Sequence, residues 1–575
     1  MFRQLIIILF LFFSMHSSWS QQDLKKYEGN WIGTLPNVHS FNFNITLAEL
    51  KSGAYNLIIS NGKTSIDKKI MSVGDQRMKF AIDEQTHLEL DVTNGGAEMN
   101  GFIKSGVLMY HINLKKIRTN VYQGSWNPLM IDSLQSQSIY LSFENYDDGS
   151  FAVYPFFGDQ RFSGTWAGGF VKVKDVISFR DVKTGFKFKA TLLTNKIQLE
   201  IIFYETTIAV ANLVPSTIDL NAIGIETPQN QSITKPIALN DGWVTTSLKE
   251  FEINPEPLAR LIDSINNKSL VNTHSVLISK KGTLVFETYF DGYKNAIPHD
   301  QRSAAKSISS AIVGIAIDDR IIMSTNQRAY DLLPMDYQKT QDTLKEKISI
   351  KNLLTMSSGL DAIDFGIESN SVASENNYQN ADNWLKTVVQ APMINEPGTQ
   401  ANYGSANPFL LGVILDNALS IPLEFYLNKK LFAPLGITNY IIQTDDTTMR
   451  PYLGGGMYLT SRDMLKFGLL YLNKGTWEGQ QIISKKYVED SFKKYLVLEN
   501  TNDKNEYGYL WWHKTYDVKG KHIESVEARG SGGQYLFVIP ELELVVVITS
   551  GNYRNGKFQQ PEKIISEYIL PAILN

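Results

Sequence analysis

Short runs in which apolar and polar residues alternate characterise the first part of the chain. Residues 41–45 (FNFNI) and 88–92 (LELDV) place an apolar side chain at every second position, which is the period of a strand with one buried face. Turn clusters such as residues 94–96 (NGG) separate these runs with residues that favour tight hairpins. The pattern predicts an all-β domain over residues 21–118.

The same pattern continues over residues 119–215 and opens with a repeated motif. Residues 27–31 (YEGNW) and 122–126 (YQGSW) share the pattern Tyr-x-Gly-x-Trp. A repeat of this kind indicates a duplicated small β domain, either a barrel or a sandwich, in which each tryptophan plugs the core. A chance match of three letters is the alternative, and the shared succession of strands and turns weighs against it.

A polar stretch interrupted by prolines, residues 216–240, separates these blocks from a third and is interpreted as a linker. The third block, residues 241–575, mixes two periodicities. Hairpins are predicted at residues 275–290 and 535–549, and buried helices at residues 308–317 and 409–419. Hairpins at both ends with helices between them predict an α/β domain whose single antiparallel sheet is flanked by helices. The predicted fold class is therefore multidomain, with two all-β domains followed by this α/β domain.

The N-terminus has the order of features typical of an export signal, and we predict a signal peptide at residues 1–20. Arg3 precedes an apolar run at residues 5–13, and Ser18 and Ser20 supply the small side chains that a signal peptidase requires. The run is too short to cross a bilayer, which takes about 20 residues. We expect the mature protein to be exported, either periplasmic or secreted, and not membrane-spanning.

Composition narrows the chemistry that the chain can perform. Its 575 residues include no cysteine, so thiolate nucleophiles, cysteine zinc sites and disulfides are excluded. The eight histidines are scattered without an HExxH pattern, so we predict no metal and no other cofactor. A formal net charge of −4, without a basic stripe, gives no attraction for nucleic acid.

One serine has a lysine placed to activate it. In the sequence Ser303-Ala304-Ala305-Lys306 the serine precedes a long apolar helix, and positions i and i+3 share a helical face. The amine of Lys306 should therefore lie beside the hydroxyl of Ser303, where it can take up the hydroxyl proton. The pattern SxxK occurs five times in the chain, and only this copy opens a long apolar helix. No GxSxG elbow offers a competing nucleophile.

The wider string around Ser303 resembles the serine β-lactamase-like family, which includes class C β-lactamases, penicillin-binding proteins, carboxylesterases and 6-aminohexanoate-oligomer hydrolases. Residues 299–307 (HDQRSAAKS) match the nucleophile segment, and five more segments follow in order. They are residues 353–361 (LLTMSSGLD), 396–412 (EPGTQANYGSANPFLLG), 454–475 (GGGMYLTSRDMLKFGLLYLNKG), 507–512 (YGYLWW) and 530–547 (GSGGQYLFVIPELELVVV). The resemblance covers residues 241–575 and does not extend to the two β blocks.

The resemblance implies a second motif, Tyr-x-Ser, at residues 403–405. In the family, the tyrosine acts with the lysine as general base and then donates a proton to the leaving group, which assigns these roles to Tyr403. We expect the ammonium of Lys306 to lower the pKa of the Tyr403 phenol toward working pH. Ser405 is assigned to the substrate-binding and oxyanion region.

The third motif of the family, a Lys or His followed by any residue and Gly, matches best at Ser531-Gly532-Gly533. Serine here replaces the cation with which β-lactamases and peptidases hold a substrate carboxylate. The resemblance implies that the backbone amides of Ser303 and Gln534 form the oxyanion hole. Arg529 lies nearby in the sequence, which does not place it in the pocket.

These residues predict an exported serine hydrolase that cleaves a small-molecule ester or amide through an acyl-enzyme on Ser303. The alternative is a non-catalytic or penicillin-binding envelope protein whose β domains bind a cell-surface glycan or lipid. Retention of Ser303, Lys306 and Tyr403 together favours catalysis, because a binding protein has no chemical reason to hold all three.

Overall fold

The chain forms two compact units, residues 1–225 and 226–575, and each is described by itself. The division falls inside the predicted linker, and the predicted signal peptide lies outside the described residues. The computed structural model describes residues 25–35, 42–61, 65–71, 77–82, 86–128, 138–145, 151–157, 167–203, 206–217, 232–339, 342–365, 371–445, 448–501, 503–553 and 555–574.

The first unit is all-β, as the alternating pattern predicts. Its first sheet has the strand order β5 (Met78–Ala81), β6 (Thr86–Thr93), β7 (Glu98–Ser105), β8 (Leu108–Arg118), β9 (Val121–Trp126), β2 (Phe43–Glu49), β3 (Tyr55–Ser60) and β4 (Ser65–Ile70). Its second sheet has the order β11 (Phe151–Phe157), β10 (Ser138–Asn145), β1 (Gly29–Thr34), β16 (Thr206–Ser216), β15 (Lys196–Phe203), β14 (Lys187–Leu193), β13 (Val176–Asp181) and β12 (Ala167–Val173). Both sheets are antiparallel and curled, and the second nearly closes because β11 and β12 approach each other.

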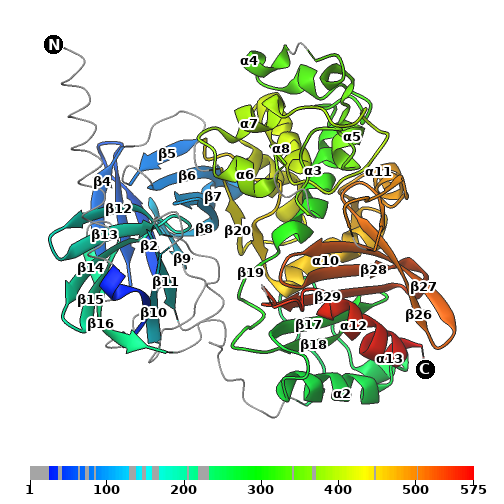
Figure 1. The fold of residues 1–575 in the computed structure, drawn as a ribbon, viewed down its shortest axis with the longest axis horizontal. Coiled ribbons are helices and arrows are strands. Elements are labelled where there is room, and N and C mark those ends of the chain that lie inside the picture. Colours follow the sequence, from blue (N-terminus) through cyan, green and yellow to red (C-terminus); the bar gives the residue numbers. More distant parts are fainter. Residues whose placement is uncertain are drawn as a thin grey trace. The chain divides into compact units, whose positions relative to one another are not determined.

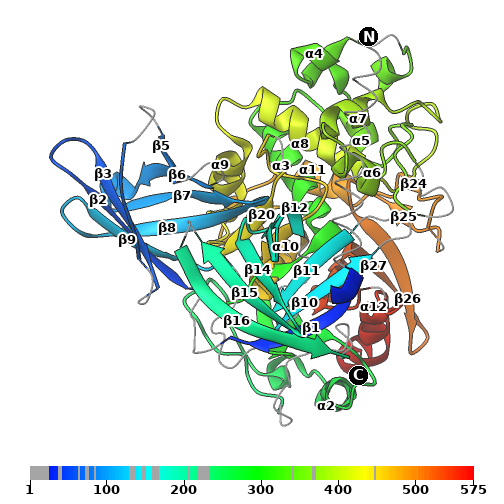
Figure 2. The same cartoon turned by 60° about the vertical axis from the view of Figure 1, so that its left-hand side comes forward.

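The two sheets do not follow the order of the sequence repeat, because the first strand of each repeat belongs to the other sheet. Strand β1 lies between β10 and β16, where Trp31 faces Leu141 and Pro215 (Figure 2). Strand β9, which carries the second copy of the motif, lies between β8 and β2. The N-terminal strand therefore completes the second sheet. The predicted boundary between residues 118 and 119 divides the two sequence repeats, but it does not separate the strands of one sheet from those of the other.

The repeated tryptophans lie in the cores of these sheets, as the motif predicts. Trp31 and Trp126 are both buried. The indole N–H of Trp31 donates to the carbonyl of Tyr27 at 2.9 Å, so the tryptophan and tyrosine of the motif contact each other directly. The ring of Trp126 packs on Phe43 of β2 with centroids 6.0 Å apart. Each motif thus anchors a strand to the sheet that receives it.

The second unit contains one large antiparallel sheet made from both ends of the unit, as the hairpins predict. Its strands in order are β18 (Thr283–Tyr289), β17 (Thr273–Lys280), β29 (Leu544–Ser550), β28 (Gln534–Ile539), β27 (Lys521–Gly530), β26 (Trp512–Val518), β25 (Glu506–Tyr507) and β24 (Leu496–Val497). The pairing of β17 with β29 joins the first and last strands of the unit in sequence.

Helices cover both faces of this sheet because its central strands are apolar on both sides (Figure 1). On β28, Tyr535 and Phe537 face one layer of helices, and Leu536 faces the helix α10. The first layer comprises α2 (Pro255–Asn266), α12 (Gln560–Ile564) and α13 (Leu570–Ile573), and α10 is Ser461–Leu472. The predicted antiparallel sheet flanked by helices is confirmed.

The remaining helices and short strands form a region beside the sheet. The predicted helices at residues 308–317 and 409–419 are α3 (Lys306–Asp318) and α8 (Ala406–Ala418), and the others are α4 (Met335–Gln338), α5 (Ile350–Leu354), α6 (Glu375–Gln379), α7 (Trp384–Gln390), α9 (Leu423–Leu427) and α11 (Lys485–Ser491). Short strands are β19 (His299–Asp300), β20 (Tyr440–Gln443), β21 (Met457–Leu459), β22 (Thr476–Trp477) and β23 (Gln480–Gln481). In the described part of the chain, no single helix is long and apolar enough to cross a membrane, and α8 passes such a test only as a pair with residues 423–432, bent by 95°.

The exchanged strand makes a testable prediction about local stability. Trp31→Ala removes a buried indole from β1, a change that typically costs about 3–5 kcal/mol. We expect amide hydrogen exchange to accelerate in β10 and β16, which flank β1, and to stay slow in β2 to β8. Acceleration confined to residues 43–118 would instead show that β1 pairs within its own repeat.

Candidate active site

The nucleophile candidate lies in a single helical turn that runs into a buried helix. Ser303 belongs to the 3-10 turn Arg302–Ala305, and Lys306 is the first residue of α3. The amine of Lys306, which is 1% exposed, donates to the Ser303 Oγ at 2.8 Å. The predicted i, i+3 contact therefore exists, and the serine hydroxyl has a base within proton-transfer distance.

The backbone just before Ser303 is held in an uncommon conformation. Arg302 has a φ of 49°, a left-handed value that L-residues adopt only when their surroundings enforce it. Asp300 provides that enforcement, because its carboxylate accepts the Arg302 backbone N–H at 2.9 Å and pairs with the Arg302 Nε at 3.1 Å. The guanidinium also lies 5.2 Å from the ring centre of Tyr553. The turn that aims Ser303 is thus fixed by contacts to side chains rather than by helix propensity.

Tyr403 completes the group of three predicted catalytic residues. The Lys306 Nζ lies 5.2 Å from its ring centre, and Ser303 is close enough to lower the pKa of its phenol. Its backbone is held by a residue that sequence reasoning missed, since the Asn500 side chain accepts from the Tyr403 N–H at 2.7 Å and donates to the Tyr403 carbonyl at 3.1 Å. Asn500 belongs to no motif, so no local pattern indicated this reciprocal pair.

Three aromatic rings surround the ring of Tyr403. Phe365 stacks on it with centroids 5.0 Å apart, and Trp512 and Tyr507 lie at 5.2 and 6.4 Å. Trp512 and Tyr507 are buried, whereas Phe365 is 48% exposed. Buried rings therefore enclose the Tyr403 phenol on one side, and the partly exposed ring of Phe365 lies against it.

Burial shifts the pKa values of the two candidate proton carriers in opposite directions. Loss of water lowers the pKa of Lys306, because a buried amine resists charging, although nearby carboxylates oppose this shift. Burial raises the pKa of Tyr403, and its hydrogen bond with Ser303 reduces that shift only in part. The expectation that Lys306 lowers the Tyr403 pKa is therefore wrong. Lys306 is the group suited to accept the Ser303 proton, and Tyr403 remains a neutral phenol.

Ser405 is buried and does not offer its hydroxyl to the open site. Its Oγ donates to a carboxylate oxygen of Asp364 at 2.6 Å, and its backbone N–H donates to the same oxygen at 2.7 Å. Sequence reasoning missed Asp364, which lies in a loop remote in sequence from residues 403–405. The predicted role of Ser405 in binding substrate remains a prediction.

The third motif contacts the nucleophile turn through Gly530, the residue just before it. A Cβ on Gly530 would lie 2.3 Å from the Gln301 carbonyl oxygen and 3.1 Å from the Ala304 nitrogen. The end of β27 can therefore reach the Ser303 turn only without a side chain at residue 530. The following residue, Ser531, is exposed beside this contact.

The other predicted residues of the third motif pack away from that contact. Gly532 approaches the ring of Tyr553, and Gly533 approaches Ser550. The buried Gln534 side chain donates to the Ser550 carbonyl at 2.6 Å and accepts from its N–H at 3.2 Å. Gly532 thus lies against Tyr553, the same tyrosine whose ring lies 5.2 Å from the Arg302 guanidinium.

Arg529 is occupied by acidic partners and does not replace the missing cation of the third motif. Its Nε contacts Glu527 at 2.7 Å, and its Nη1 contacts Glu562 of α12 at 3.3 Å. The guanidinium also lies 5.0 Å from the Trp512 ring centre. Its charge is therefore balanced beneath the helical layer of the sheet.

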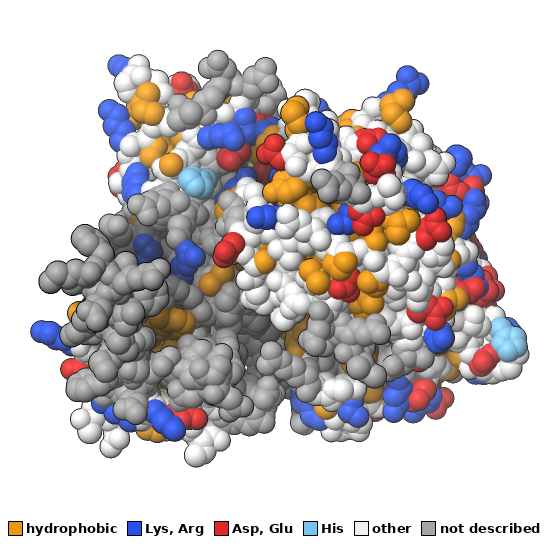
Figure 3. Space-filling view, turned by 45° about the horizontal axis from the view of Figure 1, so that its top comes forward, with side chains coloured by type: hydrophobic (Ala, Val, Ile, Leu, Met, Phe, Trp, Pro, Cys, Tyr) orange, Lys and Arg blue, Asp and Glu red, His pale blue; other side chains and the backbone are white. Residues whose placement is uncertain are grey.

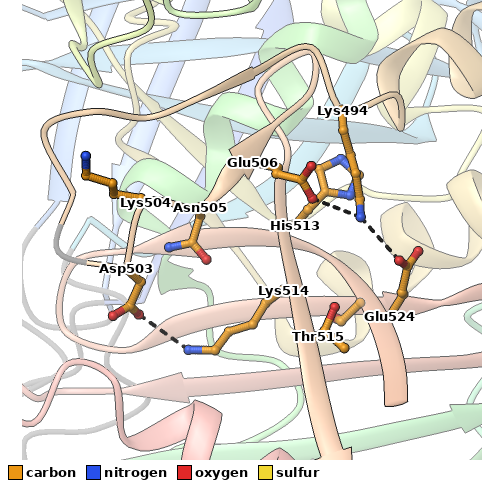
Figure 4. A pocket seen from close by; sticks show the side chains of 10 residues that line it. Lys494, Asp503, Lys504, Asn505, Glu506, His513, Lys514, Thr515 and Glu524 are labelled. Atoms are coloured by element: carbon orange, nitrogen blue, oxygen red, sulfur yellow. Dashed lines mark hydrogen bonds and ion pairs between the residues drawn. The ribbon is translucent and has the colours of Figure 1, made fainter.

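A separate pocket of about 320 Å³ lies along the β25–β27 edge and contains none of the three catalytic candidates (Figure 4). Lys494 bridges Glu506 and Glu524 at 2.9 and 3.2 Å, and Lys514 contacts Asp503 at 3.5 Å. The positive and negative side chains that line this pocket therefore neutralise one another. On the face drawn in Figure 3, positive and negative side chains are similarly interspersed over the described surface.

A sheet flanked by helices, with a Ser–Lys pair at a helix start and a tyrosine ring against the same lysine amine, is the arrangement of the serine β-lactamase class. A family model described as Beta-lactamase matches residues 258–567, and the chain belongs to this family.

Individual relatives are distant. An uncharacterized protein of Mycobacterium tuberculosis is 25% identical over 176 residues, which cover 25% of this chain and 43% of that protein. A 6-aminohexanoate-dimer hydrolase of Paenarthrobacter ureafaciens is 22% identical over 293 residues, 48% of this chain and 71% of that protein. The solved structure of simvastatin synthase from Aspergillus terreus is 15% identical with a TM-score of 0.44, covering 55% of this chain and 98% of that one. The chain thus spans less than half the length of the mycobacterial relative.

The close approach of Gly530 to the nucleophile turn predicts a steric requirement. Gly530→Ala forces the strand end or the turn to move, and a displacement of about 1 Å at a reacting group can cost roughly 10²-fold in rate. We expect Ser303 to react about 100 times more slowly with a fluorophosphonate probe. Gly479→Ala is the control: at a φ of 79° the alanine strains its own hairpin, but an added Cβ has no heavy atom within 4 Å, so Ser303 should react at the wild-type rate. Wild-type reactivity of the Gly530 variant would contradict this interpretation.

Proposed function

We propose that the protein is an exported serine hydrolase that cleaves an ester or amide through an acyl-enzyme on Ser303, with Lys306 and Tyr403 carrying protons. The observation that carries the proposal is the Lys306 amine, which donates to the Ser303 Oγ at 2.8 Å and lies 5.2 Å from the ring centre of Tyr403. The depressed pKa of Lys306 supports its role as the base. Membership of the Beta-lactamase family supports the same chemistry.

Acylation needs one proton to travel from the nucleophile to the leaving group. Ser303 Oγ bonds to the carbonyl carbon as its proton passes to Lys306, and the carbonyl oxygen becomes an oxyanion. Tyr403, still protonated, donates to the leaving oxygen or nitrogen as that bond breaks, and Lys306 returns a proton to Tyr403. Water then attacks the acyl ester as the neutral Lys306 amine accepts its proton. The bond between the acyl carbon and Ser303 Oγ breaks as Lys306 passes that proton to the oxygen, which restores the serine hydroxyl and the neutral amine and releases the acid.

Backbone amides are the proposed donors to the oxyanion. Ser303 lies in the first turn of its helix, where N–H groups lack intrahelical acceptors. The second donor comes from residues 530–534, where the family resemblance indicates the Gln534 amide. The contact of Gly530 with the Ser303 turn supports this segment as the source, because the strand must lie close to deliver such a donor.

The surroundings of the site favour an uncharged, apolar substrate over one with a carboxylate. Ser531 stands where the family carries a gripping cation, and Arg529 is paired with Glu527 and Glu562. The exposed ring of Phe365 stacks on the proton donor and offers an apolar surface next to the leaving group. The name of the Paenarthrobacter relative, a 6-aminohexanoate-dimer hydrolase, supports linear amides as candidates beside esters.

Export and a role for the first unit are also proposals. The apolar run at residues 5–13 followed by small residues supports a cleaved signal. We propose that the two β sheets bind a cell-envelope ligand. Their presence in one chain with a hydrolase domain supports this proposal. Deletion of residues 22–215 distinguishes the two roles of the first unit. If the sheets bind a ligand, the deletion should leave the turnover of a soluble ester unchanged; if they serve as a scaffold for the active site, turnover should fall.

Removal of the nucleophile tests the proposed function directly. Ser303→Ala should lower the hydrolysis of p-nitrophenyl butyrate by about 10³-fold or more, because no other group can form the acyl-enzyme. Ser307→Ala, which removes a hydroxyl on the same helix that donates to the Leu510 carbonyl, should stay within a few-fold of wild type. Hydrolysis by the Ser303 variant at the wild-type rate would remove this serine from the mechanism.

The exposed ring of Phe365 predicts a substrate preference. Phe365→Ala should raise the KM for p-nitrophenyl butyrate by about 10-fold, the size of a lost buried aromatic contact of about 1.4 kcal/mol. Met335→Ala, at a methionine that is likewise exposed, is the control and should leave KM unchanged. Nitrocefin, which carries a carboxylate, should be hydrolysed poorly by all three proteins. Efficient nitrocefin turnover would contradict the inferred preference for uncharged substrates.

A further inference from the structure

Two carboxylates lie behind the Tyr403–Ser405 loop, and neither belongs to the motifs of the sequence. Asp364 accepts both bonds from Ser405 on one oxygen, and its backbone N–H donates to the Tyr403 carbonyl at 3.0 Å. The other Asp364 oxygen accepts from the backbone N–H of Glu375 at 2.8 Å. One aspartate thus ties the loop of the catalytic tyrosine to the start of α6, where the second carboxylate lies.

The carboxylate of Glu375 is itself held in place by buried phenols. The hydroxyl of Tyr452 donates to the Glu375 Oε1 at 2.5 Å, and the hydroxyls of Tyr452 and Tyr378 lie 2.5 Å apart. Both tyrosines are buried, and Tyr378 stacks on Phe409 of α8. These hydrogen bonds therefore fix the position of the Glu375 carboxylate.

Both carboxylates act on Lys306. Burial lowers the pKa of this lysine, while the charges of Glu375 and Asp364 raise it. Burial, together with repulsion from Glu375, raises the pKa of Asp364 to about 6. The Ser303 hydroxyl and the Tyr403 ring contact the amine, and Glu375 and Asp364 are the charges that raise its pKa. A buried ammonium needs a nearby negative charge to offset its lost hydration, and the acid pair supplies one.

We propose that Asp364 and Glu375 are positioning residues for acyl transfer, which hold the Tyr403–Ser405 loop and stabilise the ammonium that forms when Lys306 accepts the Ser303 proton. The proposal rests on the proposed function and adds the source of the countercharge. Asp364 mainly holds the loop in place, since it is hydrogen-bonded to both Tyr403 and Ser405. Glu375 performs mainly the charge stabilisation, since its bonds are to phenols and to Asp364 rather than to the loop.

Glu375→Gln separates charge from structure, because an amide oxygen can still accept the Tyr452 hydroxyl. Without the carboxylate the ammonium of Lys306 is less stable, so its pKa falls. A base must be uncharged to act, so rate rises with pH through this pKa, and the rising limb of the profile should move to lower pH. We expect kcat for p-nitrophenyl butyrate at high pH to fall about 10-fold, the effect of one lost charge interaction of moderate size.

Two comparison variants isolate the two roles. Glu396→Gln removes an exposed carboxylate that pairs with Lys347 at 2.9 Å and should leave both the pH profile and kcat unchanged. Ser405→Ala removes one bond to Asp364 but keeps the charge, so it should lower kcat without moving the rising limb. The thermal midpoint of each variant, with the pH dependence of Ser303 labelling by a fluorophosphonate, shows whether loss of folding contributes.

The outcomes keep this proposal apart from the proposed function. If Ser303→Ala abolishes hydrolysis and the Glu375 variant keeps the wild-type pH profile while remaining folded, the charge role is overturned and the acyl-enzyme stands. If the Ser405 variant moves the limb as much as the Glu375 variant, the pair acts by position alone and the proposal is again overturned. If Ser303→Ala is fully active, the proposed function itself fails.

Discussion

A lysine amine buried against a serine hydroxyl is the contact on which the rest of the second unit depends. An amine without water is costly to charge, so burial lowers the pKa of Lys306 and makes it a better proton acceptor. The same burial makes the site intolerant of displacement, because no solvent can substitute for a missing partner. The left-handed Arg302, the bare backbone of Gly530 and the ring of Tyr553 all serve to keep that single distance short.

The tyrosine is held by a different set of contacts from the serine and lysine. Its backbone depends on Asn500 and Asp364, which come from separate loops, and its ring depends on aromatic packing. The candidate site therefore combines two parts with separate supports, the helix that begins at Lys306 and the loop at residues 403–405. This arrangement fixes the positions of Ser303, Lys306 and Tyr403, while the ring of Phe365 stays partly exposed.

The local sequence pattern was sufficient to predict the helices and strands of the second unit and the contact between Ser303 and Lys306. Two apolar runs on either side of Pro540-Glu541 predicted a hairpin over residues 535–549, and the spacing of Ser303 and Lys306 predicted their contact. Both predictions depend on residues that are close together in the sequence. The partners of β1 and the anchoring of Tyr403 by Asn500 depend on segments far apart in sequence, which leave no local signal. The direction of the Tyr403 pKa was wrong for the same reason, since charge was visible in the sequence and burial was not.

The placement of β1 has a consequence for how the chain acquires its structure. This strand is made well before both of its neighbours, β10 and β16. It must stay unpaired during translation while the intervening strands emerge, and the loop closed by its pairing is among the longest in the unit. High contact order of this kind slows folding and exposes an unpaired strand edge meanwhile. The second sheet therefore cannot close until β16 has been made, and the edges of β1 stay open to other partners, including a holding chaperone, until then.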